Sequence, residues 1–284
     1  MKVLILGSSG LLGKELYFFL KKKKIKVFHN GLNKKKFNLA YMKNIKKLLK
    51  IKPNLIINAA AITDIDFCEN PKNDTNLINT NLLKNIFYLK SKYNLNFQLI
   101  QFSTDQLYNS EKLSKESDKI KIYNNYSLQK FLAEKICLKN ESLIFRTNFF
   151  GKSISKNKSF TDWIFEIFQS NKDFYLFKDI IFNPLRINTI CNIIYTIIIK
   201  KKFDINGIYN LGSVGKISKS SFAIFFAKKV EIFHKNFQIC NYKKVLKTKR
   251  SRNMSMNINL FKKKFMIKLP KVKDEIKSES LNYK

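Results

Sequence analysis

Apolar runs alternate along the first half of the chain with segments whose apolar positions recur every three or four residues. The runs lie at 2–6, 26–30, 54–60, 98–104 and 142–148, and the helical spacing at 10–24, 42–52, 73–93 and 126–140. Continuous apolar runs are typical of strands covered on both faces, and helices between successive strands imply right-handed crossovers. The pattern therefore predicts an α/β fold: a Rossmann-type doubly wound parallel sheet.

Beyond Gly151 the pattern is less regular. Residues 159–171 have helical spacing, 174–179 are expected to form a strand, and 187–199 a buried amphipathic helix too short to span a bilayer. We expect a nucleotide-binding domain at 1–150 and a smaller C-terminal α/β substrate lobe at 151–270, with chain exchange back to the first domain. Residues 271–284 are expected to be a polar, frayed tail.

Three of the eight glycines follow the first apolar run directly. They are spaced G-x-x-G-x-x-G at Gly7, Gly10 and Gly13, and an amphipathic segment begins at once. Gly7 permits a tight turn, Gly10 lets the backbone approach a pyrophosphate, and Gly13 allows the helix to pack on the strand. This arrangement predicts a dinucleotide-binding turn.

Polar residues also stand at the ends of the other expected strands. They are His29 and Asn30, then Asn58 before Ala59 and Ala60, then Ser103, Thr104 and Asp105, and finally Arg146, Thr147 and Asn148. Ligands of doubly wound sheets bind at the carboxyl ends of the strands. Together with the glycine turn after the first strand, five strand ends therefore predict a single ligand-binding edge of the sheet.

The helix expected to begin near Tyr126 carries Tyr126 and Lys130 on one face. An ammonium beside a phenol favours the ionised phenol, so the pair is suited to proton transfer. Thr104 or Ser103 would hydrogen-bond a carbonyl oxygen while Tyr126 protonates it. The alternative is an ordinary surface pair, because the chain has 12 tyrosines and many lysines.

The formal charge of +35 on 284 residues is extreme. It suggests nucleic-acid or membrane binding, or a compositional bias toward AT-rich codons. We favour the bias, because lysines are spread through nearly every segment, and we expect no nucleic-acid or membrane partner. Four scattered cysteines and two histidines predict no metal site and a reducing, cytoplasmic location without a signal peptide.

Six motifs together resemble the extended short-chain dehydrogenase/reductase superfamily and, within it, the dTDP-4-dehydrorhamnose reductase family. They are GSSGLLG (7–13), NAAAITDIDFCE (58–69), STDQLY (103–108), YSLQK (126–130), FRTNFFG (145–151) and GIYNLGS (207–213). The resemblance covers roughly residues 1–265. It implies NAD(P)H-dependent reduction of a nucleotide-linked 4-keto sugar, which in that family converts dTDP-4-dehydro-L-rhamnose to dTDP-L-rhamnose.

The resemblance also implies residue roles. Tyr126 would protonate the C4 oxygen, Lys130 would lower the tyrosine pKa and bind the nicotinamide ribose, and Thr104 would hydrogen-bond the carbonyl. Asn81 would lie close to the active site. The implied cofactor-binding residues are Gly7, Ser9, Gly10, Leu11, Leu12, Gly13, Asn30, Asn38, Leu39, Asn58, Ala59, Ala60, Ala61, Ser103, Tyr126 and Lys130. The implied substrate-binding residues are Thr104, Asp105, Asn148 and Phe149.

The expected cofactor is NADPH, with NADH as the alternative. An acid after the second strand would bind the 2′-hydroxyl of NAD, whereas His29, Asn30 and Lys34–Lys36 suit the 2′-phosphate of NADP. The lysines can equally be one more run in a lysine-rich chain. The chain departs from the family at Ser127, where glycine is usual, and at Asn38, where an acid is expected.

The substrate side is less defined. Arg186, Lys249, Arg250 and Arg252 are candidates for binding a nucleotide diphosphate. In the segment 247–257, Ser251, Met256 and Asn257 stand where the family has proline, leucine and aspartate, so the identity of the sugar stays open. Trp163 and the many phenylalanines are expected in the core.

Other functions remain open. One is another nucleotide-sugar reductase or epimerase, which stoichiometric NADPH consumption would distinguish because an epimerase returns the hydride. A second is a non-catalytic nucleotide-binding regulatory relative, which should have lost Tyr126 or Lys130. A third is a nucleic-acid-binding protein with steep salt dependence. A homodimer is compatible with the sequence.

Overall fold

The computed structural model describes residues 1–31, 37–170 and 172–284, so the expected contribution of Lys34–Lys36 lies outside the described residues. The chain divides into two units. Unit 1 comprises Met1–Thr104, Asn124–Arg146 and Cys191–Tyr209, and unit 2 comprises Asp105–Tyr123, Thr147–Ile190 and Asn210–Lys284. The chain passes between the units several times, so they do not coincide with the continuous ranges expected from the sequence.

Unit 1 is built on a six-stranded sheet in the order β10-β5-β4-β3-β1-β2. Its strands are β1 (Lys2–Leu6), β2 (Lys26–His29), β3 (Leu55–Asn58), β4 (Gln98–Thr104), β5 (Leu143–Thr147) and β10 (Gly207–Leu211). β1 pairs in parallel with β2 and β3, and β3 pairs in parallel with β4. The strand order reverses direction between β1 and β3, which is where a doubly wound sheet binds its ligand. The predicted fold class is confirmed.

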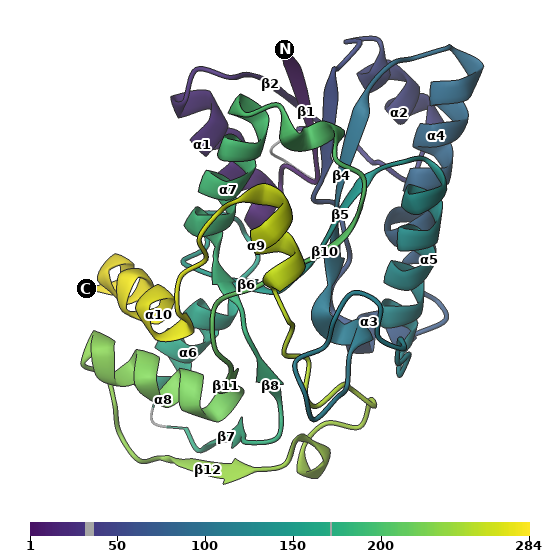
Figure 1. Ribbon diagram of the computed structural model, residues 1–284. Helices are drawn as coiled ribbons and strands as arrows, with labels where there is room; N and C mark the ends of the chain where they lie inside the picture. Colours follow the sequence, from purple (N-terminus) through teal and green to yellow (C-terminus); the bar gives the residue numbers. More distant parts are fainter. Residues whose placement is uncertain (32–36, 171) are drawn as a thin grey trace. The chain divides into compact units, whose positions relative to one another are not determined.

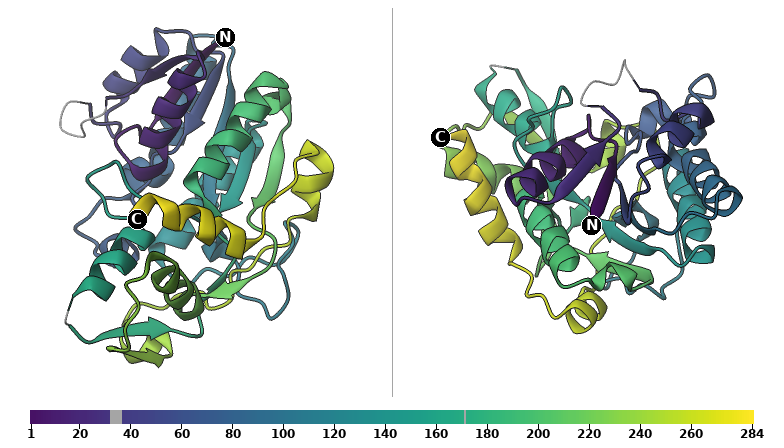
Figure 2. Two further views of the ribbon diagram at one scale, coloured as in Figure 1. Left: turned by 90° about the vertical axis from the view of Figure 1, so that its left-hand side faces the viewer. Right: turned by 90° about the horizontal axis from the view of Figure 1, so that it is seen from above.

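Helices cover both faces of this sheet. α1 and α7 lie on one face, and α2, α4 and α5 on the other (Figures 1 and 2). Their bounds are α1 (Leu11–Lys22), α2 (Met42–Leu49), α3 (Ile65–Glu69), α4 (Leu82–Lys92), α5 (Asn125–Lys139) and α7 (Ile187–Ile199). Buried side chains of β1, β3 and β4, such as Leu4, Ile56 and Leu99, pack in one cluster with Ile45 of α2 and Ile86 of α4.

The helix expected over 73–93 is divided. A π-helical segment, Leu77–Asn81, precedes α4, and the short α3 was not anticipated. The π-helical turn brings Asn79 and Thr80 into the interior, where they are 2% and 3% exposed. Buried polar side chains leave no apolar periodicity, so the sequence pattern did not reveal this irregularity.

Unit 2 contains small two-stranded sheets, β11-β8, β12-β7 and β6-β9. Its strands are β6 (Phe149–Phe150), β7 (Phe174–Phe177), β8 (Ile181–Phe182), β9 (Leu185–Arg186), β11 (Ile217–Ser218) and β12 (Phe237–Cys240), and its helices are α6 (Phe160–Gln169), α8 (Lys219–Val230), α9 (Asn259–Phe265) and α10 (Val272–Ser280). Its core is rich in phenylalanine, including Phe168, Phe182 and Phe222. Trp163 is not in the core: it is 38% exposed and stacks on Phe160.

The C-terminal segment is not a frayed tail. It forms α10 and a final 3-10 turn at Leu281–Tyr283, with Val272 6% and Ile276 0% exposed. The two apolar residues of α10 are four positions apart and share one helical face, but the charged residues around them suggested an exposed segment. Among the described residues, no helix combines the length and apolar content needed to cross a membrane.

Candidate active site

The glycine turn after β1 is closed by its own backbone. Gly7 has φ +79°, and the Gly10 amide donates to the Gly7 carbonyl at 2.9 Å. A Cβ at Gly7 would lie 2.5 Å from the Ala60 nitrogen, and one at Gly13 would overlap the Gly7 carbonyl oxygen. Gly7 therefore requires glycine for its left-handed backbone and for the close approach of Ala60, and Gly13 requires it for the close approach of the Gly7 carbonyl.

The N-terminus of α1 fits a phosphate group. Gly10 is the N-cap and has no side chain to cover the helix end, and the first turn begins with Leu11, Leu12 and Gly13. The first amides of a helix have no intrahelical acceptor, and the macrodipole favours an anion there. A Cβ at Gly10 would lie 3.3 Å from the Gly7 oxygen and, among the described residues, against no further group, so glycine leaves the helix end uncovered. A pyrophosphate fits this cradle.

Asn30, at the end of β2, holds the turn itself. Its Oδ1 accepts from the amide of Gly7 at 2.9 Å, from the amide of Ser8 at 3.2 Å and from the Ser8 hydroxyl at 3.0 Å. His29 beside it accepts at Nδ1 from the Gly31 amide at 2.9 Å. Burial, aided by the Lys21 charge, lowers the pKa of His29, so its ring is neutral at pH 7. Neither residue repels a 2′-phosphate.

Asn38 and Leu39 lie in different environments. Asn38 is exposed, and its side-chain oxygen accepts from the Ala40 amide at 2.8 Å. Leu39 is 5% exposed and belongs to the hydrophobic core of unit 1. Only Asn38 of this pair therefore presents a side chain at the surface.

The loop after β3 runs from the glycine turn toward the tyrosine helix. Ala60 lies directly over Gly7, and Ile62 packs in a small cluster with Ile65, Cys68 and Tyr126. Asn58, buried at the start of the loop, donates to Gln101 of β4 at 2.7 Å and accepts from the Ala60 amide at 3.1 Å. The structure thus brings the predicted loop 58–61 between the two predicted motifs.

Tyr126 lies in the first turn of α5. Asn124 and Ser127 form a capping box: the Asn124 Oδ1 accepts from the Ser127 amide at 2.8 Å, and the Ser127 hydroxyl accepts from the Asn124 amide at 3.3 Å. Ser127, the departure from the family's usual glycine, therefore fixes where α5 begins. Tyr126 is 7% exposed, and Thr104, at the end of β4, is 4% exposed.

Lys130 is the buried cation of the site. Its Nζ donates to the Phe102 carbonyl of β4 at 2.6 Å, which fixes α5 against the strand that ends in Thr104. Burial lowers the pKa of Lys130 to about 8, and the Glu134 carboxylate acts in the opposite direction. The ammonium form is therefore retained at neutral pH and lost at a much lower pH than for an exposed lysine.

A polar network missed by sequence reasoning supports the loop after β3. Asn79 accepts from the Ile62 amide at 2.8 Å and donates to the Ile62 carbonyl at 3.0 Å. It also donates at 2.7 Å to Gln129, which lies next to Lys130. The resemblance pointed to Asn81, but the half-buried Asn81 ends the π-helical turn and Asn79 makes these contacts. The sequence offered no signal for this network, because a buried polar side chain leaves no apolar periodicity.

Ser103, expected at the cofactor, is directed into the interior. It is 6% exposed and donates to Glu134 at 2.6 Å. In unit 2, Asn148 donates to Asp105 at 2.9 Å, and Phe149 is half-buried in β6. The structure thus joins two of the predicted substrate residues by a hydrogen bond.

The four cations proposed for a diphosphate are not equivalent. Arg186 is engaged with α10: its guanidinium donates to the Ser278 carbonyl at 3.2 Å and lies 4.0 Å from Glu279. The Lys249 ammonium lies 4.8 Å from the centre of the Tyr123 ring. Arg250 lies close enough to Lys219 to lower the pKa of that lysine, after the larger effect of burial. Arg186 is therefore in part engaged with α10.

The sheet order and the glycine cradle define a Rossmann-type α/β protein with a nucleotide-binding edge. Residues 1–283 match the family described as "RmlD substrate binding domain", and the chain belongs to that family. This confirms the resemblance stated from the motifs.

The chain is similar to known proteins over most of its own length and of theirs. The chain is 27% identical over 215 residues to GDP-6-deoxy-D-talose 4-dehydrogenase of Aggregatibacter actinomycetemcomitans, covering 70% of this chain and 71% of that protein. The dTDP-4-dehydrorhamnose reductase of Bacillus anthracis, solved in complex with NADP, superposes with a TM-score of 0.87 at 19% identity, covering 100% and 99% of the chains. The Clostridium acetobutylicum dTDP-4-dehydrorhamnose reductase gives 0.86 at 21% identity, covering 98% of each.

Proposed function

We propose that the protein is an NADPH-dependent reductase of a nucleotide-linked 4-keto sugar, with dTDP-4-dehydro-L-rhamnose as the first candidate substrate. The observation that carries the proposal is the loop after β3, which lies over Gly7 at one end and packs on Tyr126 at the other. A phosphate cradle and a proton donor are thereby connected within unit 1. Membership of the RmlD family supports the substrate class.

The residues of unit 1 account for the proton and the charge. NADPH, when bound, supplies the hydride. Tyr126 gives its hydroxyl proton to the C4 oxygen, which completes the reduction of the ketone. Lys130 stabilises the phenolate that remains and binds the ribose hydroxyls, and the Thr104 hydroxyl donates to the same C4 oxygen. These roles for Thr104, Tyr126 and Lys130 are the ones implied by the resemblance.

The preference for NADPH has two supports. Asn30, where an NAD-binding protein would have an acid, is a neutral side chain committed to the Gly7 and Ser8 amides. The B. anthracis reductase with the same fold was solved with NADP. Without a carboxylate after β2, a 2′-phosphate meets no repulsion.

A GDP-linked sugar is the second candidate substrate. The relative with 27% identity is a GDP-6-deoxy-D-talose 4-dehydrogenase. In addition, Ser251, which replaces the family's proline, is 1% exposed and donates to the Gln106 carbonyl at 2.9 Å. The residue that departs from the family pattern is thus a buried contact of the substrate-side segment.

The test is a spectrophotometric assay of the purified protein with NADPH against nucleotide-linked 4-keto sugars, including dTDP- and GDP-linked forms. We expect stoichiometric NADPH consumption with one class. Tyr126→Phe should lower kcat by about a hundredfold or more while NADPH affinity is nearly unchanged, because only the proton donor is lost.

Tyr88→Phe is the matched control, since Tyr88 lies exposed on α4, and it should retain activity. A Tyr126→Phe variant as active as the wild type would reject the assignment. NADPH binding without turnover of any sugar would favour the regulatory relative, and product formation without net NADPH consumption would favour an epimerase.

A further inference from the structure

A buried ion pair joins Glu134 of α5, one helical turn beyond Lys130, to Arg146 of β5, and the proposed mechanism does not use it. Glu134 and Arg146 are 1% and 2% exposed. Arg146 donates from Nε to Glu134 Oε1 at 2.9 Å and from a terminal nitrogen to Oε2 at 2.7 Å. Buried ion pairs contribute little net stability, because desolvation offsets their attraction. The pair therefore suggests a role other than holding the fold together.

Glu134 and Lys130 together hold the end of β4. Glu134 accepts from the Ser103 hydroxyl at 2.6 Å, and Lys130 donates to the Phe102 carbonyl at 2.6 Å. Successive residues of β4 are thus fixed by side chains one turn apart on α5. The next residue along the strand is Thr104.

The charges around Lys130 can be assigned. Burial opposes its positive charge and Glu134 favours it. Cys137, also near Lys130, is a neutral thiol, because burial raises its pKa to about 12. The other charged side chains on elements packed against α5 are Asp66 and Glu69 of α3 and Lys84, Lys90 and Lys92 of α4. None of these described residues acts on the pKa of Lys130 to a comparable degree.

We propose that Glu134 is a positioning residue: clamped by Arg146, its carboxylate keeps Lys130 in the charged form and, through Ser103, fixes the strand end that presents Thr104. The inference rests on the proposed function, because it concerns residues given roles there. Arg146 supplies the rigid two-point contact that prevents the carboxylate from turning away.

The first test is the pH profile of kcat/KM for Glu134→Gln, which preserves the side-chain shape and removes the charge. Without the carboxylate, the pKa of Lys130 falls, and the alkaline limb should move to lower pH by about one unit. Activity lost at neutral pH should recover toward the wild-type value near about pH 6, where Lys130 is protonated again. A merely structural role would lower activity equally at every pH and would overturn the proposal.

Two control variants accompany this profile. Glu134→Asp keeps the charge and should keep the alkaline limb near its wild-type position. Glu166→Gln removes a carboxylate from the exposed ion pair with Lys158 and should change neither limb. An equal shift in Glu134→Asp and Glu134→Gln would contradict the role of the charge.

The second test does not depend on turnover. A double-mutant cycle of Lys130→Met and Glu134→Gln measures their coupling in the free energy of unfolding. We expect coupling at neutral pH and its loss near about pH 10.5, where Lys130 is neutral. Equal coupling at both pH values would overturn the proposal. If the protein reduces no sugar, the proposed function fails while this cycle still decides the inference.

Glu134→Gln leaves the buried Arg146 without a charged partner, so this variant is the one with the highest risk of misfolding. In that event the double variant Glu134→Gln with Arg146→Met, which removes both charges, takes its place in the pH profile. Burial and the Glu134 charge are the largest influences on the pKa of Lys130, so the limb should move in the same direction. An unmoved limb would refute the proposal.

Discussion

At the residue scale, the three glycines of the cradle have different reasons for being glycine. Gly7 needs its φ of +79° and the close approach of Ala60, and Gly13 needs contact with the Gly7 carbonyl. Gly10 has an ordinary φ, and a Cβ there would lie 3.3 Å from the Gly7 oxygen, a milder contact than at Gly13, on the side expected to hold the pyrophosphate. Substitution of Gly13 should therefore mainly lower stability, and substitution of Gly10 should mainly weaken cofactor binding.

Gly13→Ala is expected to lower the free energy of unfolding by about 1–3 kcal/mol, because its methyl group overlaps backbone that cannot move freely. Gly10→Ala is the matched control: it should lower the free energy of unfolding by less than Gly13→Ala but weaken NADPH binding, because the methyl group fills the cradle. Thermal denaturation and NADPH titration measure the two effects. Equal destabilisation by both substitutions would contradict this division of roles.

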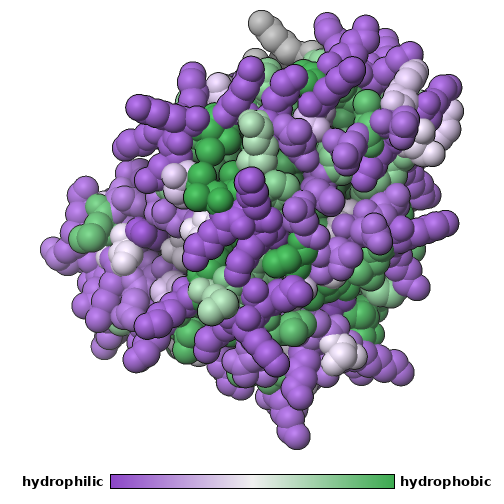
Figure 3. Space-filling model, turned by 45° about the horizontal axis from the view of Figure 1, so that its top comes forward, coloured by the Kyte–Doolittle hydropathy of each residue, from purple (hydrophilic) through white to green (hydrophobic). Residues whose placement is uncertain are grey.

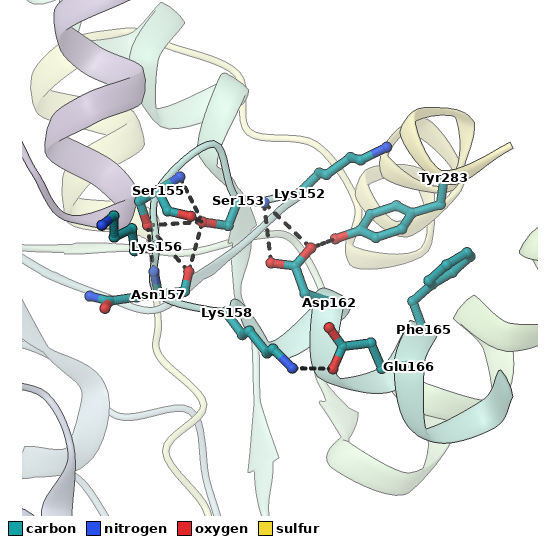
Figure 4. A pocket seen from close by; sticks show the side chains of 10 residues that line it. All are labelled: Lys152, Ser153, Ser155, Lys156, Asn157, Lys158, Asp162, Phe165, Glu166 and Tyr283. Carbon is teal, nitrogen blue, oxygen red and sulfur yellow. Dashed lines mark hydrogen bonds and ion pairs between the residues drawn. The ribbon is translucent and has the colours of Figure 1, made fainter. Parts of the chain in front are cut away.

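At the element scale, the C-terminal segment is attached to the loop after β6. Tyr283 donates to Asp162 of α6 and to Thr161 at 3.0 Å, Lys152 donates to the Asn282 carbonyl at 2.6 Å, and Glu279 accepts from the Lys152 amide at 2.7 Å. These residues line or adjoin a pocket of about 280 Å³ in unit 2, where Asp162 faces the Tyr283 hydroxyl (Figure 4). α10 therefore stabilises the loop that follows Gly151.

Tyr283→Phe is expected to lower the free energy of unfolding by about 1–2 kcal/mol, because Asp162 loses a charge-assisted hydrogen bond. Tyr175→Phe, on β7 and 39% exposed, is the control and should have little effect. Urea denaturation of both variants measures the difference. If Tyr283→Phe matches Tyr175→Phe, the C-terminal attachment contributes nothing to stability.

At the scale of the whole molecule, the net charge of +35 is the dominant property. Figure 3 shows hydrophilic side chains over most of the visible face. A field of this sign attracts any phosphorylated ligand, and added salt screens it. This effect needs no dedicated basic site, in keeping with the interpretation that the lysines reflect composition.

Raising the ionic strength from about 0.05 M to about 0.5 M should increase the KM for the nucleotide sugar by about threefold or more and leave kcat nearly unchanged, because screening weakens attraction but not proton transfer. Steady-state kinetics in increasing NaCl test this expectation. The matched control is sucrose at the same viscosity. A KM that does not respond to salt would mean that the charge is irrelevant to substrate capture.

The sequence by itself determined the first five strands of the sheet and most helices between them, the glycine turn, and the Tyr126–Lys130 spacing, because each of these depends on residues close together in the chain. Only the tertiary structure decided that Asn30 holds the Gly7 turn, that Asn79 supports Ile62, and that Glu134 joins Ser103 to Arg146. Each of those contacts joins polar groups from different elements, and a buried polar side chain has no periodicity that names its partner. The packing of strand ends and helices brings such groups together, so their roles could be seen only in the folded chain.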